Sequence, residues 1–141
     1  LRFLGTIRYD IASVIKLLEK TLYKASISID GEISNISCAF MVGCNSIHTG
    51  KGMKIAPSGG FYDEMIDMVI VKDDVSRLQL VKVFKEVYTG KITDLPYVHM
   101  SKIKSLSIDA LKDSYFNVDG ETIKSKKVSV QILPKTIKLL V

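Results

Sequence analysis

Cysteine is scarce in this sequence, and long uninterrupted apolar runs are missing from it. The 141 residues include two cysteines, Cys38 and Cys44. That number is too small for the disulfide framework of a small secreted domain. The longest apolar stretch, between these two cysteines, falls far short of the roughly 20 residues that span a bilayer. With no secretory signal at the start, the sequence predicts a single cytoplasmic domain with reduced thiols and a core of its own.

Several motifs with known chemistry are also missing. The sequence contains no nucleophile elbow, dinucleotide-binding fingerprint or phosphate-binding P-loop. His48 and His99 are too scattered relative to Cys38 and Cys44 for a zinc site, which needs paired ligands at short spacing. No RNA-binding aromatic signature, zinc-finger spacing or basic heptad helix is present either. We therefore expect no nucleic acid among the partners.

What the sequence does contain is apolar surface and a modest excess of positive charge. A hydrophobic fraction of 47% and a mean hydropathy of +0.21 exclude a disordered chain. Twenty Lys and Arg against fifteen Asp and Glu give a net charge of +5. This charge is a mild bias toward phosphorylated ligands or an anionic membrane, and a solvated lysine-rich surface is the simpler explanation of it. The cluster Lys124, Lys126 and Lys127 is typical of a protected strand edge.

Hydrophobic periodicity predicts two helices. Over residues 7–22, apolar side chains recur at offsets of 3, 4, 7 and 11 from Ile11, which places them on one helical face, with Asp10 as the N-cap. Ser76 and Gln79 have the spacing of a capping box. The helix that follows carries apolar residues up to Tyr88, and Gly90 is its expected end.

The rest of the chain predicts short strands with tight turns. Asp30-Gly31 and Asp119-Gly120 are hairpin-type turns because both residue types tolerate positive φ. We expect a mainly β fold of the α+β class, an antiparallel β-sandwich or barrel with two flanking helices. The expected strands cover residues 25–29, 33–44, 68–71, 98–108, 115–118, 128–133 and 136–141.

Two groups of acidic residues are candidates for binding chemistry. Asp119-Gly120-Glu121 places two carboxylates at one rim of a sheet, where they can orient phosphates and hold Mg²⁺. The same tripeptide occurs at Asp30-Gly31-Glu32, so an ordinary hairpin is the alternative. Asp63 and Asp67 follow a glycine-rich loop. They are compatible with a cation site or with a polar loop rim.

Five segments, each a weak signal alone, occur in an informative order. They are Leu4-Gly5, the glycine-rich stretch 45–57 that ends in Ala56-Pro57, the acidic stretch and strand 63–71, the capped helix with Leu95-Pro96-Tyr97-Val98 after it, and Val118-Asp119-Gly120-Glu121. In this order and spacing the chain resembles, over essentially its whole length, the C-terminal domain of the diacylglycerol kinase and sphingosine kinase family. The capped helix and the Leu-Pro-Tyr-Val segment bring it closest to the sphingoid-base branch.

The resemblance implies an ATP-dependent lipid kinase that phosphorylates a lipid hydroxyl, most closely that of a sphingoid base, with diacylglycerol or ceramide as alternatives. It implies that residues 1–141 form the lipid-binding C-terminal half of a longer enzyme, inactive alone. The N-terminal nucleotide-binding domain, with its Gly-Gly-Asp-Gly-type loop, is absent: Gly59-Gly60 is followed by Phe61. From another class, the alternative is a non-catalytic lipid- or membrane-binding β-sandwich. Either protein would associate with an anionic membrane surface from the cytoplasm.

The resemblance also implies site residues. Asp119, Gly120 and Glu121 would face ATP and Mg²⁺, with the two carboxylates in catalysis and metal binding. Apolar positions that match the family's acyl tunnel could equally be plain core. One departure is Glu64, which stands where the family usually has glycine. The candidate lipid-binding positions are Met53, Ile55, Val69, Phe84, Val87, Ile92 and Val98.

Overall fold

The computed structural model describes residues 21–48, 52–60 and 63–133. The first predicted helix (7–22) and the last predicted strand (136–141) lie outside these ranges, apart from Thr21 and Leu22, which belong to no element. In chain order the elements are β1 (Tyr23–Ile29), β2 (Glu32–Cys44), β3 (Ile66–Lys72), α2 (Arg77–Thr89), the 3-10 helix η1 (Ile92–Asp94), β4 (Val98–Ile103), β5 (Ser105–Val118) and β6 (Glu121–Gln131).

The strands form one antiparallel sheet in the order β4-β3-β2-β1-β5-β6. Both predicted hairpin turns are present. Asp30 and Gly31 join β1 to β2 at φ of 51° and 92°, and Asp119 and Gly120 join β5 to β6 at 50° and 93°. These left-handed conformations explain why glycine is the second residue of each turn.

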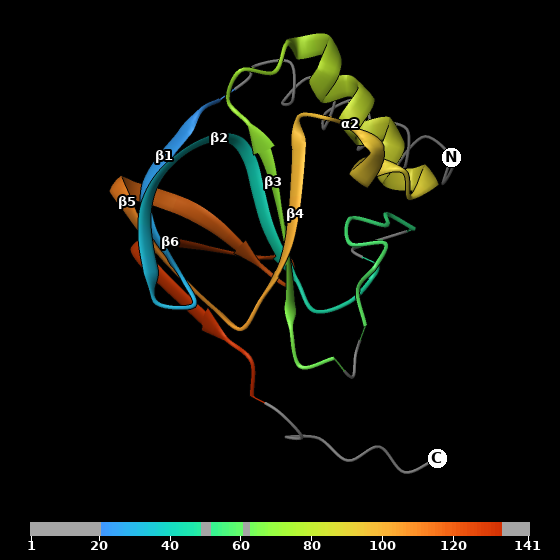
Figure 1. Cartoon of the computed structure of the whole chain (residues 1–141). Coiled ribbons are helices and arrows are strands. Elements are labelled where there is room, and N and C mark those ends of the chain that lie inside the picture. Colours follow the sequence, from blue (N-terminus) through green and yellow to red (C-terminus); the bar gives the residue numbers. More distant parts are fainter. Residues whose placement is uncertain (1–20, 49–51, 61–62, 134–141) are drawn as a thin grey trace, which may run out of the picture.

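The sheet curls, so that its two halves face each other (Figure 1). One buried cluster joins residues of β3 and β4 to residues of β1 and β5, among them Met68, Ile103, Ile27 and Ile108. No pairing between β4 and β6 closes the sheet within the described ranges. The expected antiparallel β-sandwich-like fold of the α+β class is therefore confirmed.

Helix α2 covers the other face of β3, and its N-terminus forms as the sequence predicts. The Ser76 side chain accepts a hydrogen bond from the backbone N–H of Gln79, and the Gln79 side chain accepts one from the backbone N–H of Ser76. Gly90 ends the helix at φ 77° and donates its N–H to the carbonyl of Glu86. The helix buries Leu80, Val83 and Val87, which follow one another at helical spacing.

Several predicted strand bounds were wrong. A single strand over residues 98–108 was expected, but the chain turns at Lys104 and enters a different part of the sheet. The predicted strand 115–118 is part of the longer β5, and the predicted strand 128–133 starts inside β6 but runs two residues past its end at Gln131. Strand β3 starts at Ile66, two residues earlier than predicted. The lysines at 124, 126 and 127 lie on β6, an edge strand of the sheet, as edge protection requires.

No helix in the described part of the chain is both long and apolar enough to cross a membrane.

Candidate functional site

The Asp119-Gly120-Glu121 turn is exposed, and its carboxylates have no partner in the part of the chain that the structure describes. All three residues lie on the surface. The N–H of Gly120 donates to Oδ1 of Asn117 at 3.1 Å, so this amide of the turn is satisfied locally. Among the described residues, no hydrogen bond or ion pair engages the carboxylate of Asp119 or Glu121. As far as the described residues go, both carboxylates are therefore free to bind a ligand.

The turn lies at the end of the β5–β6 hairpin, whose residues 114–125 are here called the β5–β6 arm. Phe116 of the arm packs against the buried cluster that includes Ile27 and Met68. Strand β1 supports β5 only as far as Ala110. The register of β5 with β6 then shifts between Asp109 and Ser114, and the arm continues without β1 beside it. Its surface includes apolar side chains: Tyr115 is 72% exposed, Val118 47% and Ile123 41%.

The two carboxylates of the arm do not by themselves form a metal site. Within the part of the chain that the structure describes, no group of three or more His, Cys, Asp or Glu residues is placed to hold a metal ion. Mg²⁺ takes six ligands in near-octahedral geometry and usually keeps several waters beside phosphate oxygens. The Asp119 and Glu121 carboxylates fit this chemistry as two protein ligands. The remaining ligands would come from a nucleotide, water or another domain.

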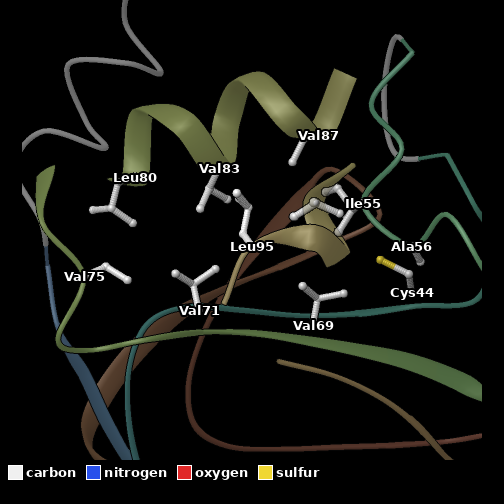
Figure 2. Packing of buried hydrophobic residues seen from close by; sticks show 11 residues of the cluster. Cys44, Ile55, Ala56, Val69, Val71, Val75, Leu80, Val83, Val87 and Leu95 are labelled. Atoms are coloured by element: carbon white, nitrogen blue, oxygen red, sulfur yellow. The ribbon is translucent and has the colours of Figure 1, made fainter. Parts of the chain in front are cut away.

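A second candidate region is the cluster packed between α2, η1, the 52–60 loop and the sheet, here called the apolar cluster. In Figure 2, Leu80, Val83 and Val87 project from the helix toward Val69 and Val71 on β3. Its buried members are Cys44, Ile55, Ala56, Val69, Val71, Val75, Leu80, Val83, Val87, Ile92 and Leu95. Met53 and Val98 are among the partly buried side chains packed against them.

The structure brings six of the seven candidate lipid-binding residues together here. Ile55, Val69, Val87 and Ile92 are buried members of the cluster, and the other two, Met53 and Val98, lie on its margin. Their assignment to lipid binding stays a prediction, because the same packing is that of an ordinary core.

The seventh candidate, Phe84, lies apart from this group. It is half-buried, and its ring contacts Tyr88 edge to face, with 5.4 Å between the ring centroids. Val83, its neighbour in the chain, is buried in the cluster and was not among the candidates. Its position in the sequence, three residues after Leu80 and four before Val87, is the pattern that could have identified Val83 as buried.

Charged side chains close one end of the apolar cluster. The ammonium of Lys102 on β4 bonds to the carboxylate of Asp63 and lies 3.3 Å from Oδ1 of Asp67 on β3. The hydrogen bond from Lys102 lowers the pKa of Asp63, and the same bond raises the pKa of Lys102. Asp63 also accepts the N–H of Met65 at 3.2 Å. Of the two alternatives for Asp63 and Asp67, a cation site or a polar loop rim, the contacts of both carboxylates with Lys102 fit the polar rim.

Glu64 keeps the backbone conformation that favours glycine. Its φ is 53°, in the left-handed region that non-glycine residues enter at a cost. Glu64 therefore occupies a left-handed position at a cost in backbone strain.

The first Asp-Gly-Glu tripeptide has a structural role. One oxygen of the Asp30 carboxylate accepts the backbone N–H groups of Lys104 and Ser105, each at 2.8 Å. The N–H of Asp30 donates to the carbonyl of Ser105 at 3.1 Å. The Ser105 and Lys104 amides lower the pKa of Asp30. These bonds attach the β1–β2 turn to the β4–β5 corner.

The chain is similar to several known proteins. It is 26% identical over 138 residues to a probable YegS-like lipid kinase of Shewanella frigidimarina, covering 98% of this chain and 44% of that protein. It is 33% identical over 100 residues to sphingoid long-chain bases kinase 1 of Arabidopsis thaliana, covering 69% of this chain and 13% of that protein. The chain thus spans less than half the length of these curated relatives.

Solved structures show the same fold. The crystal structure of a putative diacylglycerol kinase from Bacillus anthracis matches with a TM-score of 0.69 at 16% identity, covering 89% of this chain and 43% of that one. A family model described as the YegS C-terminal NAD kinase beta sandwich-like domain matches residues 1–141. The chain therefore belongs to the YegS C-terminal domain family, the C-terminal domain of the diacylglycerol and sphingosine lipid kinases.

Proposed function

We propose that this chain is the lipid-binding half of an ATP- and Mg²⁺-dependent lipid kinase that phosphorylates the hydroxyl of a sphingoid base. Residues 1–141 act together with an N-terminal nucleotide-binding domain, which supplies the phosphate-binding loop. The 33% identity to a sphingoid long-chain base kinase favours that lipid over diacylglycerol and ceramide.

The observation that carries this proposal is the uncommitted Asp119-Gly120-Glu121 turn at the tip of the β5–β6 arm. Its carboxylates make no bond to the described residues, whereas the same tripeptide at Asp30 is bonded to a neighbouring corner of the sheet. A turn that only reverses the chain direction does not need two free carboxylates. Phosphoryl transfer does need them, because positioning and charge stabilisation supply most of its catalysis.

In this proposal the two carboxylates bind the nucleotide and its metal ion, and the apolar cluster binds the lipid. Asp119 and Glu121 hold Mg²⁺ and orient the phosphates of ATP, which supplies the phosphoryl group. Met53, Ile55 and Val98 at or beside the cluster contact the lipid chain, together with Val69, Val87, Ile92 and the half-buried Phe84. The exposed apolar side chains of the arm, Tyr115 and Val118, rest against the nucleotide-binding domain.

The proposed location is the cytoplasmic face of a membrane, bound peripherally. The net charge of +5 supports attraction to anionic lipid headgroups, where each nearby Lys or Arg contributes about 1 kcal/mol. A membrane-bound enzyme also meets its water-insoluble substrate directly.

The test is a phosphorylation assay of the full-length protein with ATP, Mg²⁺ and sphingosine, with diacylglycerol and ceramide in parallel. Asp119→Asn and Glu121→Gln should each reduce turnover at least about tenfold, because they remove charge from the phosphate site. Glu32→Gln is the matched control, since Glu32 occupies the corresponding position in the other Asp-Gly-Glu turn.

Three outcomes of this assay contradict the proposal in different ways. If Asp119→Asn and Glu121→Gln both phosphorylate lipid at the wild-type rate, this turn has no role in catalysis. Preference for diacylglycerol or ceramide excludes the sphingoid-base assignment only. Binding of lipid vesicles without phosphorylation of any of the three lipids favours a non-catalytic lipid-binding domain.

A further inference from the structure

The charged group at the end of the apolar cluster consists of Lys102, Asp63 and Asp67. Asp67 on β3 and Lys102 on β4 are direct partners in the antiparallel register. Alternate side chains of a strand share a face, so Asp67 lies on the same face as Val69 and Val71. That is the face on which the apolar cluster is built. The charges therefore lie where this cluster meets the chain segment that follows the glycine-rich loop.

Lys102 joins three segments that are separate in the chain. Its ammonium bonds to Asp63, which precedes β3, and pairs with Asp67 within β3 at 3.3 Å. It also donates to the backbone carbonyl of Ser58 in the 52–60 loop at 3.3 Å. The loop carbonyl is 44 residues from Lys102 in sequence. One side chain thus connects the loop to both of the strands below it.

Asp67 makes this connection energetically important. Its side chain is 1% exposed, and neither of its carboxylate oxygens accepts a hydrogen bond from the described residues. A buried carboxylate without a compensating positive charge is strongly unfavourable. Within the described residues, Lys102 is the cation in ion-pair contact with Asp67. Loss of this contact would therefore leave a buried carboxylate without a balancing charge.

The 52–60 loop approaches the same carboxylate through Gly59. A Cβ at Gly59 would lie 3.1 Å from Oδ2 of Asp67 and 3.0 Å from the carbonyl of Ala56. The Gly59 N–H donates to that Ala56 carbonyl at 2.8 Å. The loop backbone therefore rests directly on the buried acid, and its position depends on how the charge of the acid is balanced.

We propose that Lys102 is a positioning residue that holds the 52–60 loop closed over the apolar cluster, and so fixes Met53 and Ile55 for contact with the lipid. The assignment to lipid contact rests on the proposed function. The loop attachment itself rests only on the contacts of Lys102, and the two parts are tested separately.

The first test is peptide-resolved hydrogen–deuterium exchange of residues 52–60 in the full-length protein. Lys102→Met keeps the alkyl chain and removes the charge, and we expect exchange in this loop to accelerate about tenfold or more. Lys102→Arg should restore slow exchange. Lys82→Met changes an exposed lysine of α2 and is the matched control. Equal exchange in Lys102→Met and Lys82→Met overturns the proposal.

A double variant separates charge balance from packing and remains informative if Lys102→Met folds poorly. In Asp67→Asn/Lys102→Met the buried charge is gone, so the loop should exchange more slowly than in Lys102→Met alone. Exchange as fast as, or faster than, in the single variant means that the Asp67 charge is not what Lys102 balances, and it contradicts the proposal.

The second test separates the loop attachment from catalysis. In the sphingosine assay, Lys102→Met should raise the KM for sphingosine about tenfold while leaving kcat and the KM for ATP near wild type. An unchanged KM for sphingosine with a mobile loop overturns the positioning role but leaves the proposed kinase intact. A wild-type protein without kinase activity refutes the proposed function, and the exchange experiment still decides the loop attachment.

Discussion

The two Asp-Gly-Glu turns have the same sequence and nearly the same backbone, but opposite surroundings. Asp30 and Asp119 have φ values of 51° and 50°, and the glycines that follow have 92° and 93°. The Asp30 carboxylate accepts two backbone N–H groups from the β4–β5 corner. The Asp119 turn ends the β5–β6 arm, beyond the last residue of β5 that pairs with β1.

This difference shows that a turn motif specifies local backbone geometry and not its use. The partner of Asp30 is supplied by residues 74 and 75 positions away in sequence, and no such partner is supplied to Asp119 by the described residues. One carboxylate is a structural group, and the other is available for chemistry. The following predictions test this contrast, from the largest expected effect to the smallest.

The largest effect should separate two variants by the property they change: Asp119→Asn should lower activity, and Asp30→Asn should lower stability. Asp119→Asn should lower kinase turnover by about 100-fold, the usual loss when one preorganised electrostatic group is removed, with little change in the thermal unfolding midpoint. Asp30→Asn should lower the unfolding midpoint while turnover per folded molecule stays near wild type. Sphingosine phosphorylation and calorimetry measure the two effects. A similar loss of stability in both variants would falsify the contrast.

The second effect is the acid dependence of the Asp30 contact. Bonds from the Ser105 and Lys104 amides lower the pKa of Asp30 in the folded state below the ordinary value of 3.8. A lowered folded-state pKa stabilises the protein above the unfolded value, and this stabilisation is lost as the pH falls through the folded value. The unfolding midpoints of wild type and Asp30→Asn should therefore differ at pH 7 and converge below about pH 3.8. An equal difference at pH 7 and pH 3 contradicts this account.

A third prediction concerns the glycines, which should behave alike in the two turns. A Cβ at Gly31 or Gly120 would meet no atom within 4 Å, so the cost of alanine comes only from the positive φ. Gly31→Ala and Gly120→Ala should each lower the free energy of unfolding by about 1–2 kcal/mol. Urea denaturation measures this quantity. Costs that differ severalfold would show that surroundings, and not backbone strain, decide these positions.

The smallest effect extends the comparison to a third left-handed residue. Glu64 has φ 53°, and Glu64→Gly should raise the free energy of unfolding by about 0.5–1 kcal/mol, since relief of strain outweighs the added flexibility of the unfolded chain. Glu32→Gly, in a strand position with ordinary φ, is the control and should destabilise the protein. Destabilisation by Glu64→Gly would mean that the Glu64 side chain contributes more than its conformation costs.

Local signals predicted much of the fold. The capping box at Ser76 and the end of α2 at Gly90 were confirmed, because both depend on residues a few positions apart. The two hairpin turns were confirmed for the same reason. Alternation of apolar and polar residues also placed β1 and most of β2 correctly.

Features that depend on distant partners were not predictable. The break between β4 and β5 at Lys104 arises where Asp30 binds the backbone, and nothing near residue 104 signals it. Strand β3 begins earlier than expected because it includes the buried Asp67, whose charge is balanced by Lys102 on β4. The split of the candidate lipid residues, with Phe84 outside the apolar cluster and Val83 inside it, depends on how α2 is rotated on the sheet.

The connection from β4 to β5 also has a consequence for the order in which the molecule folds. These strands follow each other in the chain but occupy the first and fifth places of the sheet. Strand β5 can pair with β1 only after some 80 residues of intervening chain have been drawn together, and closing a loop of that length slows folding. The two hairpins and α2 can form within their own segments. We therefore expect the bonds of Asp30 to the β4–β5 corner to form late, after the transition state, so that their loss accelerates unfolding and leaves the folding rate nearly unchanged.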